Sequence, residues 1–112
     1  MLEKTVKDAV RDLLTARGAY WFMPVQTGYG RRSVDFLICY RGNFIAVETK
    51  RHGKRATANQ ENCLFQIALA GGRSAVEDDP DCPKLKKILA EIDDEILVRQ
   101  GQASALLSRS GV

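Results

Sequence analysis

The sequence predicts an α/β fold in which helices flank a small mixed β-sheet. The first observation is an N-terminal segment, 2–17, whose apolar residues recur at helical spacing. The second is a pair of short apolar runs, 34–40 and 43–50, separated only by Arg41 and Gly42, which is typical of a β-hairpin. The third is the order of the segments after the hairpin: a helical segment, a short strand and another helical segment.

The first helix is expected over residues 2–17, with Gly18 as its C-terminal cap. The residues that create its apolar face are Leu2, Val6, Ala9, Val10, Leu13 and Leu14. Residues 20–27 are rich in aromatic and β-prone side chains and predict a strand that is interrupted at Pro24. Residues 28–33 contain two glycines and two arginines, so we expect a loop there.

The hairpin has a predicted register. If residues 40–43 form its loop, the facing pairs are Cys39 with Phe44, Leu37 with Ala46, and Asp35 with Glu48. The other side of the hairpin then carries Phe36, Ile38, Ile45 and Val47. Because both sides are apolar over most of their length, the hairpin should be covered on both faces. Asp35 and Glu48 lie where the apolar pattern stops.

The second half of the chain predicts a helix, a strand and a helix. The first helix should run from Thr57 to about Ala70 and end at Gly71-Gly72; its expected inner face is Leu64, Ile67 and Ala68. A strand is expected over 74–77. Asp81 should cap the last helix, which has Pro83 in its first turn and an apolar face of Leu85, Ile88, Leu89 and Ile92.

The length and composition fit one domain. The chain has 112 residues, 45% of them hydrophobic and 28% charged, which allows a single core. We expect the domain to span residues 1–99 and the weakly patterned tail, 100–112, to be flexible or to contact a second chain. No apolar stretch approaches the roughly 20 residues of a membrane span. We therefore expect a soluble, cytoplasmic protein with no membrane partner.

Charge is unevenly distributed along the chain. The formal net charge is only +3, but the region between Tyr29 and Arg55 is strongly basic, with Asp35 and Glu48 as its isolated carboxylates. This arrangement favours a polyanionic ligand whose phosphates contact the basic side chains. The candidate contacts are Arg31, Arg32, Arg51, Lys54 and Arg55. A solvated, charge-rich loop is the alternative explanation.

The chemistry is expected to centre on Asp35, Glu48 and Lys50. Residues 48 and 50 are two apart on one strand, so their side chains project from the same face. The hairpin register places Asp35 about 5 Å from Glu48. Two such carboxylates repel each other unless a cation lies between them, and Mg²⁺ prefers oxygen ligands. The Thr49 carbonyl could supply another ligand. Alternatively, Asp35 and Glu48 are simply polar residues at strand ends, and Lys50 forms an ion pair at the surface.

These residues resemble a known family. The strings SVDFLI (33–38) and FIAVETK (44–50) are similar to the core motif of PD-(D/E)XK nucleases, with Ser33-Val34 where many members have proline. More specifically, residues 2–80 resemble the VRR-NUC (virus-type replication-repair nuclease) branch. The matching features are Glu3 in the first helix, a G-x-x-x-x-D loop ending in Asp35, E-T-K at 48–50, T-x-x-Q at 57–60 and Gly71-Gly72.

The resemblance implies a restriction-endonuclease-like αβββαβ core followed by a C-terminal helix. It implies a Mg²⁺- or Mn²⁺-dependent deoxyribonuclease, with Asp35 and Glu48 as metal ligands, Lys50 as the catalytic lysine, and Glu3 and Gln60 as assisting residues. Stand-alone phage and bacterial members look like homodimers that cut branched DNA such as four-way junctions, in DNA repair and replication. The tail and the aromatic strand at 20–23 are candidates for a dimer interface.

Alternatives stay open at three points. Glu3 could simply favour the first helical turn and pair with Lys7, four residues on. Thr57 and Gln60 have the spacing of a capping box, which would explain both side chains. At the level of function, the alternatives are a catalytically silent nucleic-acid-binding module on the same fold and a sequence-specific restriction-type endonuclease.

Overall fold

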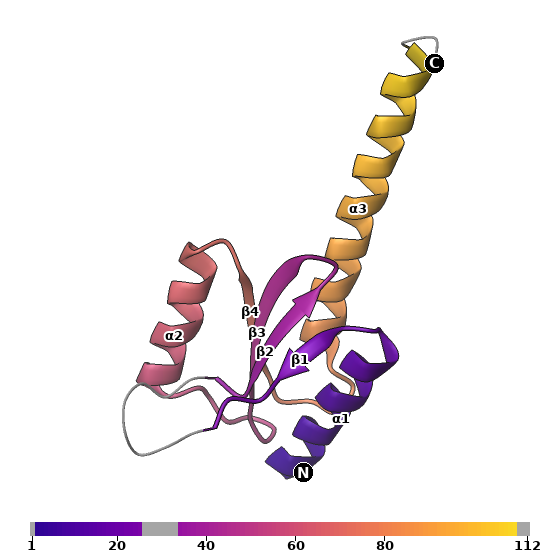
Figure 1. The fold of residues 1–112 in the computed structure, drawn as a ribbon. Helices are drawn as coiled ribbons and strands as arrows, with labels where there is room; N and C mark the ends of the chain where they lie inside the picture. The colour runs from indigo at the N-terminus through magenta and orange to yellow at the C-terminus, as the bar shows by residue number, and fades with distance from the viewer. Residues whose placement is uncertain (1, 26–33, 110–112) are drawn as a thin grey trace.

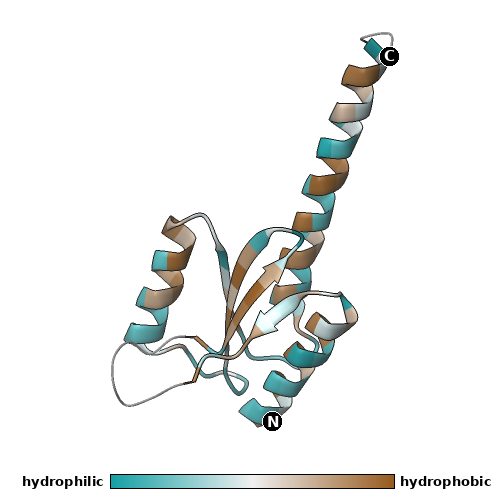
Figure 2. Ribbon diagram, viewed as in Figure 1, coloured by the Kyte–Doolittle hydropathy of each residue, from teal (hydrophilic) through white to brown (hydrophobic). Residues whose placement is uncertain are grey.

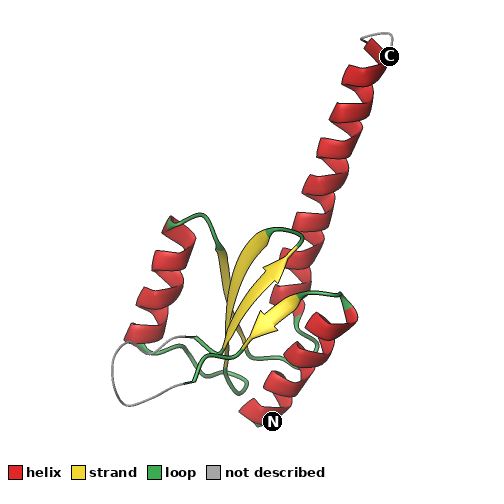
Figure 3. Ribbon diagram, in the orientation of Figure 1, coloured by secondary structure: helices red, strands yellow, loops and turns green. Residues whose placement is uncertain are grey.

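The computed structural model describes residues 2–25 and 34–109 and has the predicted α/β architecture (Figure 1). Helices flank a four-stranded sheet, and the chain ends in a long helix (Figure 3). The elements in chain order are α1 (Glu3–Ala16), β1 (Tyr20–Phe22), β2 (Phe36–Tyr40), β3 (Asn43–Thr49), α2 (Ala58–Leu69), β4 (Arg73–Glu77) and α3 (Pro83–Arg109). This is the predicted order of one helix, three strands, a helix, a strand and a C-terminal helix.

The sheet is mixed, as expected. Its strand order is β1-β2-β3-β4; β2 is antiparallel to both of its neighbours, whereas β3 and β4 are parallel and joined through α2. One face of the sheet packs against α1 and α3, and the other packs against α2. The hairpin is therefore covered on both sides, and the buried side chains of β3 form a continuous run through the middle of the molecule.

The hairpin register is confirmed. Cys39 pairs with Phe44 and Leu37 pairs with Ala46, while the other side carries the four buried residues that were expected there: Phe36, Ile38, Ile45 and Val47. The turn residues Arg41 and Gly42 both have positive φ, 49° and 82°, as a tight hairpin turn requires. The pairing of Phe36 with Val47 places Asp35 and Glu48 at the open end of this ladder.

Strand β1 is shorter than the sequence suggests. The expected strand ran to residue 27, but pairing with β2 ends at Phe22, and residues 23–25 continue without strand structure. Pro24 has no backbone N–H to donate to a neighbouring strand, which explains the early end. The loop expected at 28–33, with Arg31 and Arg32, lies outside the described residues.

Helix α2 begins as predicted but faces the sheet differently. Thr57 is its N-terminal cap, and Leu64 and Ile67 face the sheet. The expectation for Ala68 was wrong, because Ala68 is exposed, and partly buried Cys63 packs against this core instead. Cys63, Leu64 and Ile67 share one stripe at helical spacing, and Ala68 lies at the side of that stripe.

Helix α3 is capped from another element. Asp81 was expected to cap it, but the Leu85 backbone N–H, in the first turn, donates to Glu77 Oε2 at 3.0 Å. The Asp81 N–H instead donates to Asp79 Oδ1 at 2.8 Å. Cys82, at the junction, has a φ of 52°, and the resulting sharp turn places the end of β4 beside the start of the helix.

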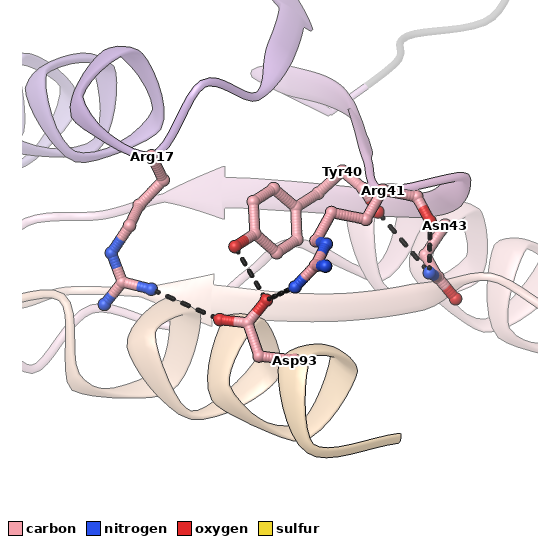
Figure 4. A network of polar contacts seen from close by, with 5 residues as sticks. All are labelled: Arg17, Tyr40, Arg41, Asn43 and Asp93. Atoms are coloured by element: carbon pink, nitrogen blue, oxygen red, sulfur yellow. Dashed lines mark hydrogen bonds and ion pairs between the residues drawn. The ribbon is translucent and has the colours of Figure 1, made fainter. Parts of the chain in front are cut away.

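The long helix α3 is anchored to the hairpin by Asp93 (Figure 4). Asp93 Oδ1 accepts hydrogen bonds from the Tyr40 hydroxyl at 2.8 Å and from the Arg41 guanidinium at 2.9 Å. Arg17, after the end of α1, lies 3.8 Å from Asp93 Oδ2. These interactions lower the pKa of Asp93, the bond from Arg41 most strongly. One aspartate thus joins three elements.

Beyond this anchor, α3 continues past position 100, where the sequence pattern weakens. The expected tail is helical through Arg109, and all of residues 97–109 are exposed. The proposed boundary at 99 therefore falls inside a continuous helix. Figure 2 shows apolar residues on this outer part of α3 as well as on the sheet. Among the described helices, not one combines the length and the apolar character that crossing a membrane requires.

Candidate active site

Three carboxylates meet at one end of the sheet. Glu3 begins α1, Asp35 precedes β2, and Glu48 is near the end of β3. One oxygen from each lies within 4.8 Å of the others, which is a suitable separation for ligands of one metal ion. The hairpin register thus brings Asp35 and Glu48 together as expected, and α1 adds Glu3. We call these three residues the carboxylate cluster.

Thr49 holds Asp35 in place. Its backbone N–H donates to Asp35 Oδ2 at 3.0 Å, and its hydroxyl donates to the same oxygen at 2.6 Å. Thr49 is fully buried, so this clamp is shielded from water. The sequence pointed only to the Thr49 carbonyl, whose role as a metal ligand stays a prediction. A hydroxyl residue beside one of a facing carboxylate pair was the signal for the clamp.

Glu48 is the most perturbed carboxylate of the cluster. Its side chain is 2% exposed, and its Oε2 atom is buried without a hydrogen-bond partner in the described part of the chain. Burial, followed by the hydrogen bond and the negative charge of Asp35, raises the pKa of Glu48 to about 8, against the opposing effect of Lys50. A buried, unpaired carboxylate oxygen is unfavourable unless something compensates it. A divalent cation bound by carboxylate oxygens would provide that compensation.

Glu3 takes part in two sets of contacts, and its assisting catalytic role stays a prediction. Its Oε2 lies 3.8 Å from the ammonium of Lys7, which is the predicted ion pair on α1. The same Glu3 belongs to the carboxylate cluster. Lys7 also lies 3.7 Å from Asp35 Oδ1, a contact that the sequence did not indicate because it depends on how α1 docks against the sheet.

Basic side chains border the carboxylate cluster. An open pocket of about 270 Å³ is lined by Glu3 together with Lys50, Arg51, Lys54 and Arg55. Four of the basic residues singled out from the sequence therefore lie around one cavity, which one cluster carboxylate also lines. Arg31 and Arg32 lie outside the described residues, so their part in this surface stays a prediction.

Gln60 is engaged in a helix cap. Its Oε1 accepts a hydrogen bond from the Thr57 N–H at 2.8 Å, and its own N–H donates to the Thr57 hydroxyl at 3.3 Å. This is the complete capping box that the spacing predicted. Gln60 does not line the pocket described above. Its assisting catalytic role stays a prediction.

Comparison with solved structures supports the fold assignment. No protein-family model and no curated protein matches the chain. A solved structure described as a "VRR_NUC domain" superposes with a TM-score of 0.59 and 21% sequence identity, over 76% of this chain and 94% of that one. Together with the element order, the mixed sheet and the C-terminal helix, this match shows that the chain has the restriction-endonuclease-like fold of a VRR-NUC domain.

Proposed function

We propose that this protein is a metal-dependent nuclease that hydrolyses phosphodiester bonds in DNA. The observation that carries the proposal is the buried Oε2 of Glu48, which lacks a partner among the described residues and belongs to the carboxylate cluster. A module that only binds nucleic acid has no need for clustered carboxylates, which repel phosphates. The VRR-NUC fold adds support, because the solved domain with this fold carries a nuclease name.

The residues fit a hard divalent cation such as Mg²⁺ or Mn²⁺. Asp35 and Glu48 would hold it through carboxylate oxygens, with Glu3 and the Thr49 carbonyl as further candidates. When bound, the cation supplies Lewis-acid activation of the phosphate and of a water nucleophile. The donor set contains only oxygen, which matches such a cation better than zinc.

The remaining chemistry belongs to the basic side chains around the pocket. Lys50, which lines the pocket with Glu3, would orient the nucleophile or donate to the phosphate oxygens on which charge develops. Arg51, Lys54 and Arg55 line the same pocket. They would bind neighbouring phosphates and so hold the DNA strand against the site. Because such contacts read the backbone rather than the bases, the surface suits recognition of DNA shape.

We further propose that the substrate is branched DNA, such as a four-way junction, and that the active form is a homodimer. Symmetric cutting of two strands requires two active sites related by a two-fold axis. The exposed outer part of α3 offers a surface for this association. Such an enzyme would act in DNA repair or replication, in the cytoplasm of a bacterial or phage-infected cell. These features of the proposal rest on the family resemblance.

The test is cleavage of labelled four-way, flap and linear duplex DNA with Mg²⁺ or Mn²⁺. Wild type should cut a branched substrate, and Lys50→Ala should cut it about 10²–10³-fold more slowly, the loss typical of removing one stabilising donor. Lys87→Ala, which removes an exposed lysine of α3, should retain wild-type activity. If wild type binds DNA but cuts no substrate with either metal, the protein is a silent binding module. Sequence-dependent cutting of linear duplex would instead indicate a restriction-type enzyme.

A further inference from the structure

Lys7 reaches two members of the carboxylate cluster at once. Its ammonium lies 3.7 Å from Asp35 Oδ1 and 3.8 Å from Glu3 Oε2. The Lys7 side chain is 30% exposed and that of Asp35 only 14%, so water screens this pair less than a fully exposed one. Lys7 is one turn after Glu3 on α1, and the docking of the helix against the sheet brings it to Asp35.

Lys7 lies beside one oxygen of Asp35 and one oxygen of Glu3, and both residues belong to the carboxylate cluster. Asp35 Oδ2 already accepts two hydrogen bonds from Thr49, which leaves Oδ1 as the less engaged oxygen of this carboxylate. Lys7 lies beside that oxygen. By contrast, the buried Oε2 of Glu48 has no partner in the described residues. Lys7 therefore neutralises one side of the cluster and leaves the Oε2 of Glu48 without a partner among the described residues.

We propose that Lys7 is the internal counter-ion of the carboxylate cluster and competes with the divalent cation for Asp35 and Glu3. This inference rests on the metal site of the proposed function. Without metal, the ammonium reduces repulsion among the three carboxylates. When metal is present, the same positive charge opposes its binding, so Lys7 makes the site weaker than its carboxylates alone would make it.

If Lys7 bound DNA phosphates, we would expect it to line the basic pocket. The basic residues that line the pocket are Lys50, Arg51, Lys54 and Arg55, and Lys7 is not among them. Lys7 faces carboxylates at both of its close contacts. The geometry therefore favours an effect on metal affinity over an effect on DNA affinity.

The test compares Lys7→Met with Lys4→Met. Lys4 is on the same helix but pairs with Asp8 at 3.3 Å, so its removal changes the net charge equally without touching the cluster. Calorimetric titration with Mg²⁺ and with Mn²⁺ should show at least about fivefold tighter binding to Lys7→Met than to wild type. Lys4→Met should stay within about twofold, and Lys7→Arg, which keeps the charge, should resemble wild type. Unchanged or weaker metal binding by Lys7→Met would contradict the proposal that Lys7 competes with the cation.

A second measurement tests the counter-ion without metal. In a double-mutant cycle, thermal unfolding is followed for Lys7→Met, Asp35→Asn and the double variant in the presence of a chelator. Lys7→Met should lower the unfolding temperature more than Lys4→Met does, and most of this loss should disappear once Asp35 is neutral. Additive effects would overturn the counter-ion role. If wild type binds neither metal but the cycle shows coupling, the proposed nuclease function and the competition fail while the counter-ion role stands.

Discussion

At the scale of single residues, the site depends on a carboxylate placed where its charge is unfavourable. Glu48 is almost fully buried, its Oε2 lacks a partner in the described residues, and Asp35 adds a second negative charge nearby. A core position at the end of β3 would be more stable with an apolar or neutral side chain. A bound cation would offset the unfavourable burial of the Glu48 carboxylate. The cost of this buried charge is therefore evidence for a metal-binding function.

Glu48→Gln tests this link. Glutamine keeps the shape of the side chain and can donate a hydrogen bond to Asp35, so the metal-free variant should unfold at the same temperature as wild type or higher. Mg²⁺ should stabilise wild type but not Glu48→Gln, because a ligand stabilises only the state that binds it. Differential scanning fluorimetry with and without Mg²⁺ measures both effects. The matched control is Glu61→Gln, an exposed position on α2 that should respond to Mg²⁺ as wild type does. An equal Mg²⁺ response in Glu48→Gln would contradict the assignment.

The residues of the site differ in how well the sequence predicts them. The proximity of Asp35 and Glu48 follows from strand period and hairpin register, which are local rules that two short apolar runs are enough to apply. The clamp from Thr49 and the contact from Lys7 depend on side-chain conformation and on the docking of α1. Spacing along the chain gives neither contact. The hydroxyl residue next to Glu48 marks Thr49 as a candidate partner of Asp35, but the hydrogen bond itself is seen only in the structure.

At the scale of elements, the start of α3 shows how a non-local contact replaces a local rule. Capping rules search the residues next to a helix and therefore indicate Asp81. In the structure, Glu77 at the end of β4 accepts the first-turn hydrogen bond of Leu85, and Glu77 is fully buried. This contact couples the edge strand of the sheet to the helix that covers the core. Helix periodicity predicts that α3 exists, but it cannot predict which strand end will cap it.

The buried position of Glu77 predicts a pH dependence of stability. Burial raises the pKa of Glu77 above its ordinary value of 4.5, against the hydrogen bonds from the Leu85 and Lys84 backbone. The folded state therefore holds the proton more tightly than the unfolded state. Its contribution to stability is fully present below pH 4.5 and is lost as pH rises through the raised folded pKa. Glu77→Gln keeps an acceptor oxygen and removes this titration.

Urea unfolding at several pH values measures the effect. As pH rises above 4.5 and through the raised folded pKa of Glu77, wild type should lose stability relative to Glu77→Gln. Glu77→Ala should be less stable than Glu77→Gln by about 0.5–2 kcal/mol, the usual cost of losing a helix cap. Glu91→Gln, an exposed position on α3, serves as the control and should follow the wild-type pH profile. Parallel profiles for wild type and Glu77→Gln would show that Glu77 does not titrate differently in the folded state.

At the scale of the whole molecule, the long helix dominates the shape. The molecule measures 60 × 28 × 21 Å because α3 extends well beyond the sheet (Figure 1). Every residue from 97 to 109 is exposed, including the large apolar side chains of Leu97, Val98 and Leu106. A helical segment as short as residues 97–109 is only marginally stable in water when nothing packs against it. The sequence did not predict this helix beyond about residue 99, because the polar residues and the glycine at 99–102 interrupt its apolar pattern.

The position of Leu106 indicates what covers this segment. Leu106 lies two heptads after Ile92, so it falls near the side of α3 that buries Ile92 against the sheet, with Arg99 at the intervening heptad position. This side of α3 therefore carries an exposed apolar residue past the end of the sheet, beyond the charge of Arg99. A second copy of the chain, related by a two-fold axis, could cover the same face on both molecules. This is the surface that we expect the proposed homodimer to use.

Light scattering on wild type and Leu106→Glu tests the whole-molecule prediction. Wild type at micromolar concentration should have twice the chain mass of 12.4 kDa, and Leu106→Glu should have the mass of one chain, because a charge at an apolar interface is strongly unfavourable. Ser108→Glu adds the same charge to an exposed position on the other side of the helix and should remain dimeric. A monomeric wild type would contradict the homodimer. A dimeric Leu106→Glu would move the interface away from α3, and the exposed aromatic side chains of β1, Tyr20 and Phe22, would become the next surface to test.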